Sequence, residues 1–238
     1  MKPILYTNGD SVVWGAELEN KQQERFSGLI CQKNNWIDCN NASAGVSNDY
    51  IFRQTLRDVS YWLETGRCWS EESGWVESDE IKVVIGWTSP TRFEWWNGLE
   101  YQQERLWIGY DKWGENDKDR TTEDIFVLNQ TEDLPSYIKT FNQIISLSAF
   151  LEKHNISHYF FNSFYEYKIL NEPYNLIDKF GKKEYQTGLE YLWKQLPTRF
   201  KEKSMYEYIE QMGGGFLQRK HPNKESHRIY SQHIIDNL

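Results

Sequence analysis

The sequence predicts an α/β fold in which a mostly parallel sheet lies between two layers of helices, a three-layer α/β/α sandwich. Short apolar segments alternate with longer segments whose apolar residues recur at helical spacing, as in strands joined by crossover helices. The clearest strand, 81–85, is apolar and β-branched at four of its five positions, as expected of a central parallel strand. A length of 238 residues suits a single domain, 1–238, with a full core.

Strands are expected where short apolar segments are bounded by polar or turn-forming residues. The four segments are 4–6, 36–40, 81–85 and 158–162. Because parallel strands present their carboxyl ends at one edge of the sheet, the loops that follow them should gather at that edge.

Helices are expected between and after these strands. One begins at Ser47 or Asn48, either of which can cap its first turn. A second begins at Leu134 and Pro135, and the last begins near Lys224. Their apolar residues recur every three or four positions. In order, these are Phe52, Leu56, Val59 and Leu63; Ile138, Phe141, Ile145 and Ala149; and Tyr230, Ile234 and Leu238.

Residues 88–133 lose this periodicity and become aromatic, acidic and glycine-containing. A long segment of this kind inside one domain is typical of a lid, a substrate wall or a partner-binding insertion. We therefore expect an irregular insertion at about 88–133.

Composition narrows the class of protein. A net charge of −8 argues against a nucleic-acid partner, and no apolar run is long enough to predict a membrane span. Residues 1–3 lead directly into the first strand, so we do not expect a signal peptide. The three cysteines lack metal-ligand spacing, so buried thiols in a reducing cytoplasm are expected. We expect a cytoplasmic protein without metal or cofactor; its oligomeric state does not follow from the sequence.

Four short motifs stand at the ends of the expected strands or in the last loop. They are Gly9-Asp10-Ser11, the segment 41–48, the segment 86–89 and His221-Pro222-Asn223. A serine is a poor nucleophile unless a neighbouring base takes its proton, and histidine is the usual base. Ser11 and His221 could instead have no catalytic role: Ser11 can cap a helix, and His221 can be a surface residue before a proline.

Taken in order, these motifs resemble the signature blocks of the SGNH, or GDSL, hydrolases, and the resemblance spans nearly the whole chain. The resemblance implies the flavodoxin-like SGNH hydrolase fold and a small-molecule ester substrate. It implies Ser11 as nucleophile and His221 as base. It also implies an oxyanion hole made by the backbone N–H groups of Ser11 and Gly45 and the side chain of Thr88.

Two positions depart from the family pattern. Thr88 stands where the family has asparagine; its hydroxyl can donate to an oxyanion or cap the following turn. Gln218 stands three residues before His221, where the family has an acid. Gln218 could still orient the imidazole. Three readings stay open: a serine–histidine dyad, an acid from elsewhere in the chain, or an inactive binding or structural module with the same fold.

Aromatic residues make up 16% of the chain, including 11 tryptophans. Most are expected in the core or scattered on the surface. Trp14, Trp87, Trp95 and Trp96 lie near the motifs, and Trp14 and Trp87 are expected to form a substrate wall. Such a wall would suit an O-acetylated carbohydrate. His227 is expected to pack beneath the site rather than act as the base.

Overall fold

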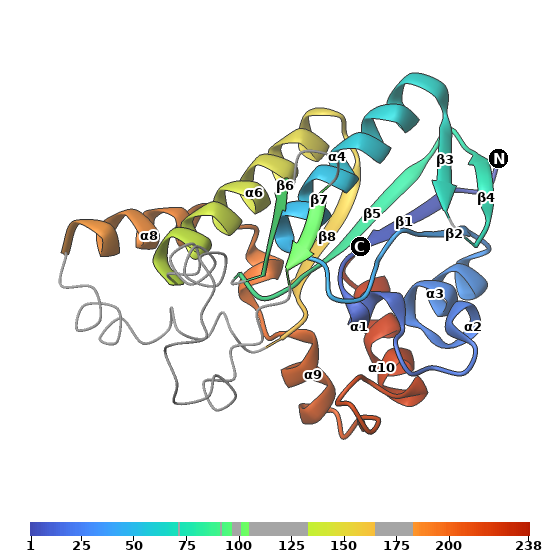
Figure 1. Ribbon diagram of the computed structural model, residues 1–238. Helices are drawn as coiled ribbons and strands as arrows, with labels where there is room; N and C mark the ends of the chain where they lie inside the picture. The colour runs from blue at the N-terminus through green and yellow to red at the C-terminus, as the bar shows by residue number, and fades with distance from the viewer. Residues whose placement is uncertain (71, 91, 97–100, 105–132, 165–182) are drawn as a thin grey trace.

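The structure is a computed structural model that describes residues 1–70, 72–90, 92–96, 101–104, 133–164 and 183–238. At its centre is a parallel sheet with the strand order β2–β1–β5–β8 (Figure 1). The strands are β1 (Ile4–Asn8), β2 (Ile37–Asn40), β5 (Ile81–Trp87) and β8 (Ser157–Asn162). All three pairings in this sheet are parallel, so the four expected strands are confirmed.

Helices cover both faces of this sheet, because alternate side chains of its buried strands point in opposite directions. Tyr6 of β1 and Val83 of β5 face one layer, whereas Leu5 and Val84 face the other. Figure 1 shows the two layers on opposite sides of the sheet. The first holds α4 (Asn48–Thr65), α6 (Asp133–Lys153) and α8 (Lys183–Gln195); the second holds α1 (Ser11–Trp14), α3 (Phe26–Asn34), α9 (Met205–Gln211) and α10 (Lys224–Ile235). The predicted α/β/α fold is therefore confirmed.

Two short elements complete the helical layers. Helix α2 (Lys21–Glu24) precedes α3, and the 3-10 helix η4 (Thr198–Lys201) lies between α8 and α9. Helix α4 begins as expected: the Ser47 side chain accepts a hydrogen bond from the Tyr50 amide.

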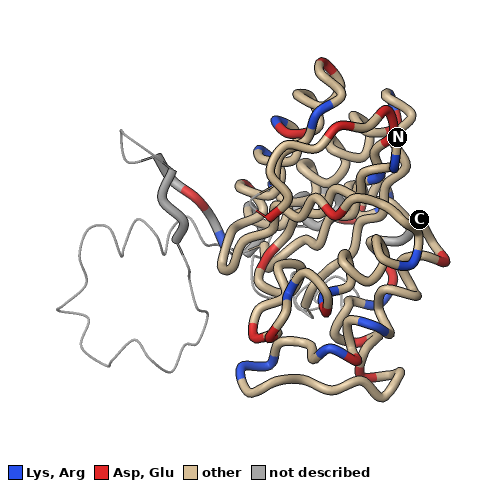
Figure 2. Tube along the Cα trace, turned by 90° about the vertical axis from the view of Figure 1, so that its right-hand side faces the viewer, with Lys and Arg blue, Asp and Glu red and all other residues tan. Residues whose placement is uncertain are grey.

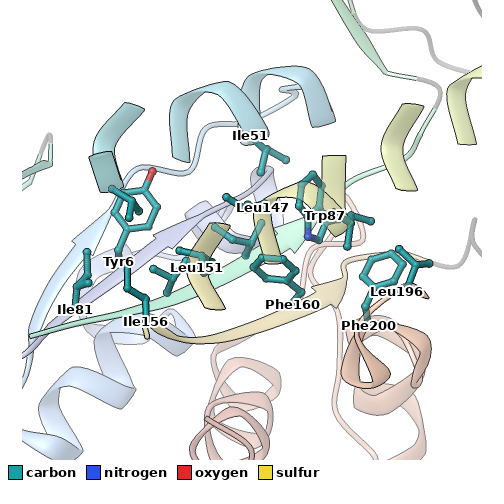
Figure 3. Close-up of a cluster of buried hydrophobic side chains, with 14 of the residues drawn as sticks. Tyr6, Ile51, Ile81, Trp87, Leu147, Leu151, Ile156, Phe160, Leu196 and Phe200 are labelled. Atoms are coloured by element: carbon teal, nitrogen blue, oxygen red, sulfur yellow. The ribbon is translucent and has the colours of Figure 1, made fainter. Parts of the chain in front are cut away.

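The core beneath the first helical layer is built largely from β1, β5, β8 and α6 (Figure 3). Trp87 and Phe160 meet edge to face, with ring centroids 5.8 Å apart. Tyr6, at the other end of this cluster, donates a hydrogen bond from its hydroxyl to Asp58 at 3.0 Å. Burial of these large rings stabilises the packing of this layer on the sheet.

Two helix faces differ from the expected ones. In α4 the buried stripe contains Ile51, Thr55 and Val59, one residue earlier than expected at its start, so Leu63 is 38% exposed. In α6 the buried residues Phe141, Ile144, Leu147 and Leu151 follow the i, i+3, i+4 pattern. Ala149 lies off this stripe and is exposed.

The structure contains two antiparallel hairpins that the sequence analysis did not predict. One joins β3 (Arg67–Ser70) to β4 (Gly74–Glu77), and the other joins β6 (Phe93–Trp96) to β7 (Tyr101–Glu104). The second lies inside the segment expected to be irregular, so that expectation is wrong for its first part. Arg53 of α4 holds β6 through two hydrogen bonds to Glu94 of 3.0 and 2.9 Å. The remainder of the insertion, 105–132, lies outside the described residues.

Acidic and basic residues are interspersed along the described trace (Figure 2). Among the described helices, none is both long and apolar enough to cross a membrane. Within the same residues, no group of three or more His, Cys, Asp or Glu side chains could hold a metal ion.

Candidate active site

Ser11 is the first residue of α1, directly after the carboxyl end of β1. The Asp10 side chain caps the helix by accepting a hydrogen bond from the Val12 amide at 2.9 Å. Gly9 is required by close packing, because a Cβ at this position would lie 2.4 Å from Val13 Cγ2 and 2.7 Å from the Gly86 carbonyl oxygen. The hydroxyl of Ser11 is thus presented at the sheet edge where the sequence placed it.

His221 lies in a tight turn that precedes α10. The Leu217 amide donates to the His221 carbonyl at 2.7 Å, and the Tyr206 hydroxyl donates to the Lys220 carbonyl at 2.6 Å. This turn brings His221 Nε2 to 3.0 Å from Ser11 Oγ, although the two residues are 210 positions apart. The structure therefore brings together the two residues that the sequence singled out as nucleophile and base.

Glu17 supplies the carboxylate on the other side of the imidazole. Glu17 Oε2 lies 2.7 Å from His221 Nδ1, and the Arg219 amide donates to the same carboxylate at 3.2 Å. Partial burial acts to raise the pKa of Glu17, but the hydrogen bonds from His221 and Arg219 outweigh it and lower the pKa from its ordinary value. The imidazole thus lies between a hydroxyl and a carboxylate.

Gln218 does not occupy the acid position in this structure. Its side chain is exposed on the turn before His221, and Nδ1 of His221 faces Glu17 instead. Sequence reasoning missed Glu17 because it sought the acid just upstream of the histidine. No sequence pattern pointed to Glu17, because its position depends on the backbone: Gly15 has a left-handed conformation with φ +81° and ends the one-turn helix α1. The acidic residue two positions later therefore stays close to Ser11.

Asp10 is fully buried beside the nucleophile. Burial raises its pKa from the ordinary value, while the positive charge of Arg92, the Val12 amide and the Thr88 hydroxyl act to lower it. Asp10 Oδ2 lies 3.8 Å from Arg92 Nη1. The carboxylate therefore joins the turn that carries Ser11 to the loop that follows β5.

Thr88 is fully buried at the end of β5. Its amide donates to Asn48 Oδ1 at 2.9 Å, and its carbonyl accepts from Asn48 Nδ2 at 3.0 Å. Its hydroxyl interacts with the Asp10 carboxylate. The oxyanion role expected for Thr88 stays a prediction.

Gly45 lies in the loop after β2 and has a left-handed backbone with φ +78°. This loop is fixed to the turn before Ser11, since the Ser43 amide donates to the Gly9 carbonyl at 3.1 Å. Within the described part of the chain, neither the Ser11 amide nor the Gly45 amide has an acceptor. Both N–H groups are therefore free for a ligand at this edge.

The tryptophans do not form the expected wall. Trp87 is 0% exposed and packs in the core against Phe160 (Figure 3), so the prediction that it lines a substrate surface is wrong. Trp14 is partly exposed, with the ammonium of Lys21 3.1 Å from its ring centroid. The side chains of Trp95 and Trp96, the last two residues of β6, lie outside the described part of the structure.

His227 packs beneath the site, as expected. Its ring stacks on Phe26 with centroids 6.0 Å apart, and its Nδ1 accepts a hydrogen bond from the Phe26 amide at 3.3 Å. Burial, and secondarily the positive charge of Arg25, lower its pKa to about 3. A neutral imidazole in this place supports α3 and α10 rather than exchanging protons with a ligand.

Fold and site together define an α/β/α protein with a serine, a histidine and a carboxylate in line at the carboxyl edge of its sheet. The chain belongs to the family of unknown function DUF6071, whose model matches residues 19–238. The comparison with curated proteins gave no match.

Several solved structures are similar to this chain at low sequence identity. A member of the lipolytic protein G-D-S-L family from Veillonella parvula is 13% identical, with 99% of this chain and 98% of that chain covered and a TM-score of 0.48. The psychrotrophic esterase EstA from Pseudoalteromonas is 10% identical, with 98% and 94% covered and a TM-score of 0.47. An acetyl xylan esterase from Butyrivibrio proteoclasticus is 11% identical, with 100% and 63% covered and a TM-score of 0.46. Likenesses of this degree do not establish an activity.

Proposed function

We propose that this protein is a serine hydrolase of small carboxylic esters. The single observation that carries the proposal is the position of His221, with Nε2 3.0 Å from Ser11 Oγ and Nδ1 2.7 Å from Glu17. A serine hydroxyl becomes a useful nucleophile when a base takes its proton, and the base works best when a third group orients it.

The reaction proceeds through an acyl-enzyme. Ser11 Oγ attacks the ester carbonyl carbon while its proton passes to His221 Nε2. The C–O bond to the alcohol then breaks, and the leaving oxygen takes the proton from His221. Water attacks the acyl-enzyme in the same way, which releases the acid and restores Ser11. The Ser11 and Gly45 amides donate to the oxygen that carries the developing negative charge.

Glu17 has two roles in this scheme. It accepts the hydrogen bond from Nδ1–H, which leaves Nε2 as the acceptor that faces Ser11. It also stabilises the imidazolium that forms when the serine proton is transferred. The lowered pKa of Glu17 keeps the carboxylate charged at neutral pH, as both roles require.

The alternative is a non-catalytic binding or structural module. The long insertion at 88–133 favours it, and the absence of an acid at position 218 was the argument against catalysis. Glu17 removes that argument, because its carboxylate reaches the imidazole nitrogen that a catalytic acid would contact. The burial of Trp87 likewise removes one of the four tryptophans that favoured a carbohydrate substrate. The substrate class that we propose is therefore a small acylated molecule, with no preference for a carbohydrate.

Labelling with a fluorophosphonate, together with hydrolysis of 4-nitrophenyl acetate, tests the proposal. We expect the label on Ser11, and we expect Ser11→Ala to abolish labelling and turnover without unfolding the protein. Glu17→Gln should lower kcat by roughly 10²- to 10⁴-fold, because the amide cannot stabilise the imidazolium.

Ser157→Ala is the matched control, since Ser157 begins β8 at the opposite edge of the sheet; it should behave like the unmodified protein. Full turnover in folded Ser11→Ala would overturn the proposal. Unchanged kcat in Glu17→Gln would leave Ser11 in place but remove Glu17 from the mechanism.

A further inference from the structure

Arg92 lies in the loop after β5, next to the residue that precedes the nucleophile. Its Nη1 is 3.8 Å from Asp10 Oδ2, and its guanidinium carbon is 5.4 Å from the centroid of the Phe164 ring. Phe164 follows β8, so Arg92 spans the carboxyl ends of β1, β5 and β8. Parallel sheets bind their ligands at this edge.

The donors of this guanidinium are largely unused. Arginine has five N–H donors, and charged groups removed from water normally have hydrogen-bond partners. Within the described residues Arg92 has the 3.8 Å ion pair with Asp10 but no side-chain hydrogen bond. Its Nη1 is buried, while 23% of the side chain is exposed. The exposed part therefore belongs to atoms other than the nitrogen that faces Asp10.

An aromatic series joins Arg92 to the histidine side of the site. The Phe164 ring packs against Tyr206 with centroids 5.2 Å apart, and Tyr206 packs against Phe216 at 4.9 Å. Phe216 forms an isolated β-bridge with Pro222, the residue after His221. Arg92 is thus linked to the proposed catalytic residues by two sets of contacts. Asp10 links it to Ser11, and the aromatic rings link it to the turn that carries His221.

We propose that Arg92 binds an anionic group, a carboxylate or a phosphate, on the ester substrate. This inference rests on the proposed ester hydrolysis and adds the charge of its substrate. A guanidinium offers paired N–H donors that match the oxygens of either anion. Asp10 holds one side of the guanidinium, and the donors that remain are available to the ligand. The half-buried rings of Phe164 and Phe216 offer an apolar surface for the neutral part of the same molecule.

A purely structural role for Arg92 leads to a different expectation. If Arg92 only neutralises the buried Asp10, its removal disturbs the turn that carries Ser11 and slows every ester alike. If Arg92 binds the substrate anion, its removal slows charged esters more than neutral ones. The ratio of kcat/KM between matched charged and neutral esters separates the two roles, because general damage to the site cancels in the ratio.

The experiment uses three aryl acetates that share a ring and differ at its meta position: a carboxylate, a phosphate monoester and a neutral methyl carboxylate. A second pair varies the acyl side, with the 4-nitrophenyl half-ester of succinate against 4-nitrophenyl butyrate. Each is measured with the unmodified protein, Arg92→Lys and Arg92→Gln. Arg67→Gln is the control, because Arg67 is an exposed arginine paired with Glu77 on the distant β3–β4 hairpin.

We expect at least one charged ester to exceed its neutral partner in kcat/KM, and Arg92→Gln to lower that ratio by about tenfold to a hundredfold. Arg92→Lys should retain part of the preference, and Arg67→Gln all of it. If the carboxylate ester is preferred, the anion that Arg92 binds is a carboxylate; if the phosphate ester is preferred, it is a phosphate. A preference among the aryl acetates places the anion on the alcohol side of the ester, and a preference for the succinate half-ester places it on the acyl side. If the ratio of kcat/KM between charged and neutral esters is the same in all variants while turnover still depends on Ser11, this inference is overturned. The proposed ester hydrolysis is then unaffected.

Absence of turnover with every ester counts against the proposed function instead. In that case binding of 3-hydroxybenzoate and of 3-hydroxyphenyl phosphate to the unmodified protein and to Arg92→Gln decides the matter by titration calorimetry. Binding that depends on Arg92 supports the anion site; no binding, or binding unaffected by the substitution, overturns it.

Discussion

The side chain of Glu17 meets His221 although 204 positions separate them. Glu17 has a left-handed backbone with φ 67°, which costs a non-glycine residue about 1 kcal/mol or more. In return, its carboxylate reaches both the imidazole and the Arg219 amide. The serine and the histidine could be predicted because each stands in a recognisable motif. The carboxylate could not, because its position depends on how the chain turns after Gly15.

His227 gives a prediction about pH at the same scale. In the unfolded chain its imidazole takes a proton near the ordinary pKa of 6.5, whereas in the folded chain the pKa is lowered to about 3. Below pH 6.5 the unfolded state therefore binds more protons, and this residue makes the free energy of unfolding fall as the pH drops from about 6.5 toward 3. The loss amounts to at most about 1.4 kcal/mol per pH unit.

His227→Gln should flatten this dependence, since an amide can still accept from the Phe26 N–H but does not titrate. Urea unfolding at pH 7 and pH 4.5 measures the effect, with His154→Gln, at an exposed histidine, as the comparison. An unchanged difference between the two pH values in His227→Gln would show that His227 is not buried as described.

At the scale of elements, the parallel strands were predictable because burial on both faces leaves a continuous apolar pattern, as in β5. The short hairpins were not. The residues of β3 alternate between exposed and buried and those of β4 between half-buried and exposed, over only four positions in each strand, too few to separate from a turn. The buried stripe of α6 was placed incorrectly at Ala149, because a helix of 21 residues offers several apolar stripes and only packing selects one.

The packing of α1 on β5 depends on a glycine in that strand. A Cβ at Gly86 would lie 2.4 Å from Val13 Cγ2 and 2.7 Å from Phe161 Cζ, so Gly86→Ala must displace α1 or β8. We expect a loss of about 1–3 kcal/mol in the free energy of unfolding and a fall in kcat, because α1 carries Ser11.

Thermal denaturation and ester turnover measure both effects of Gly86→Ala. The control is Gly74→Asn, since Gly74 has open space around its Cβ position and a left-handed backbone that asparagine tolerates. Equal stability of Gly86→Ala and the unmodified protein would mean that α1 does not pack on β5 as described.

At the scale of the whole molecule, the site joins the two ends of the chain. Helix α10 packs on α3, and its residues Tyr230 and Ile234 share a buried cluster with Phe26 and Phe161. This contact anchors α10 to the fold, and the turn at the start of α10, held by its own hydrogen bonds, places His221 over α1. The strands that precede the motifs could be predicted from the sequence. The approach of His221 to Ser11 could not, because it depends on contacts between residues far apart in the chain.

Two substitutions in α10 should separate stability from positioning. Ile234 is fully buried in the last turn, so Ile234→Ala should cost about 2–5 kcal/mol in the free energy of unfolding. Because Ile234 is far along the helix from His221, the folded protein should keep its kcat. Asn223 caps the first turn by accepting from the Ser226 amide at 2.9 Å, and its own amide donates to the Gly215 carbonyl at 3.1 Å.

Asn223→Ala should cost only about 1 kcal/mol but lower kcat, because Asn223 is two residues from His221 and ties its turn to α10. Urea unfolding and turnover at saturating ester, both below the melting transition of each variant, give the two quantities. The opposite pattern, with kcat lost in Ile234→Ala and kept in Asn223→Ala, would show that the packing of α10 as a whole, and not the turn at its start, positions the imidazole.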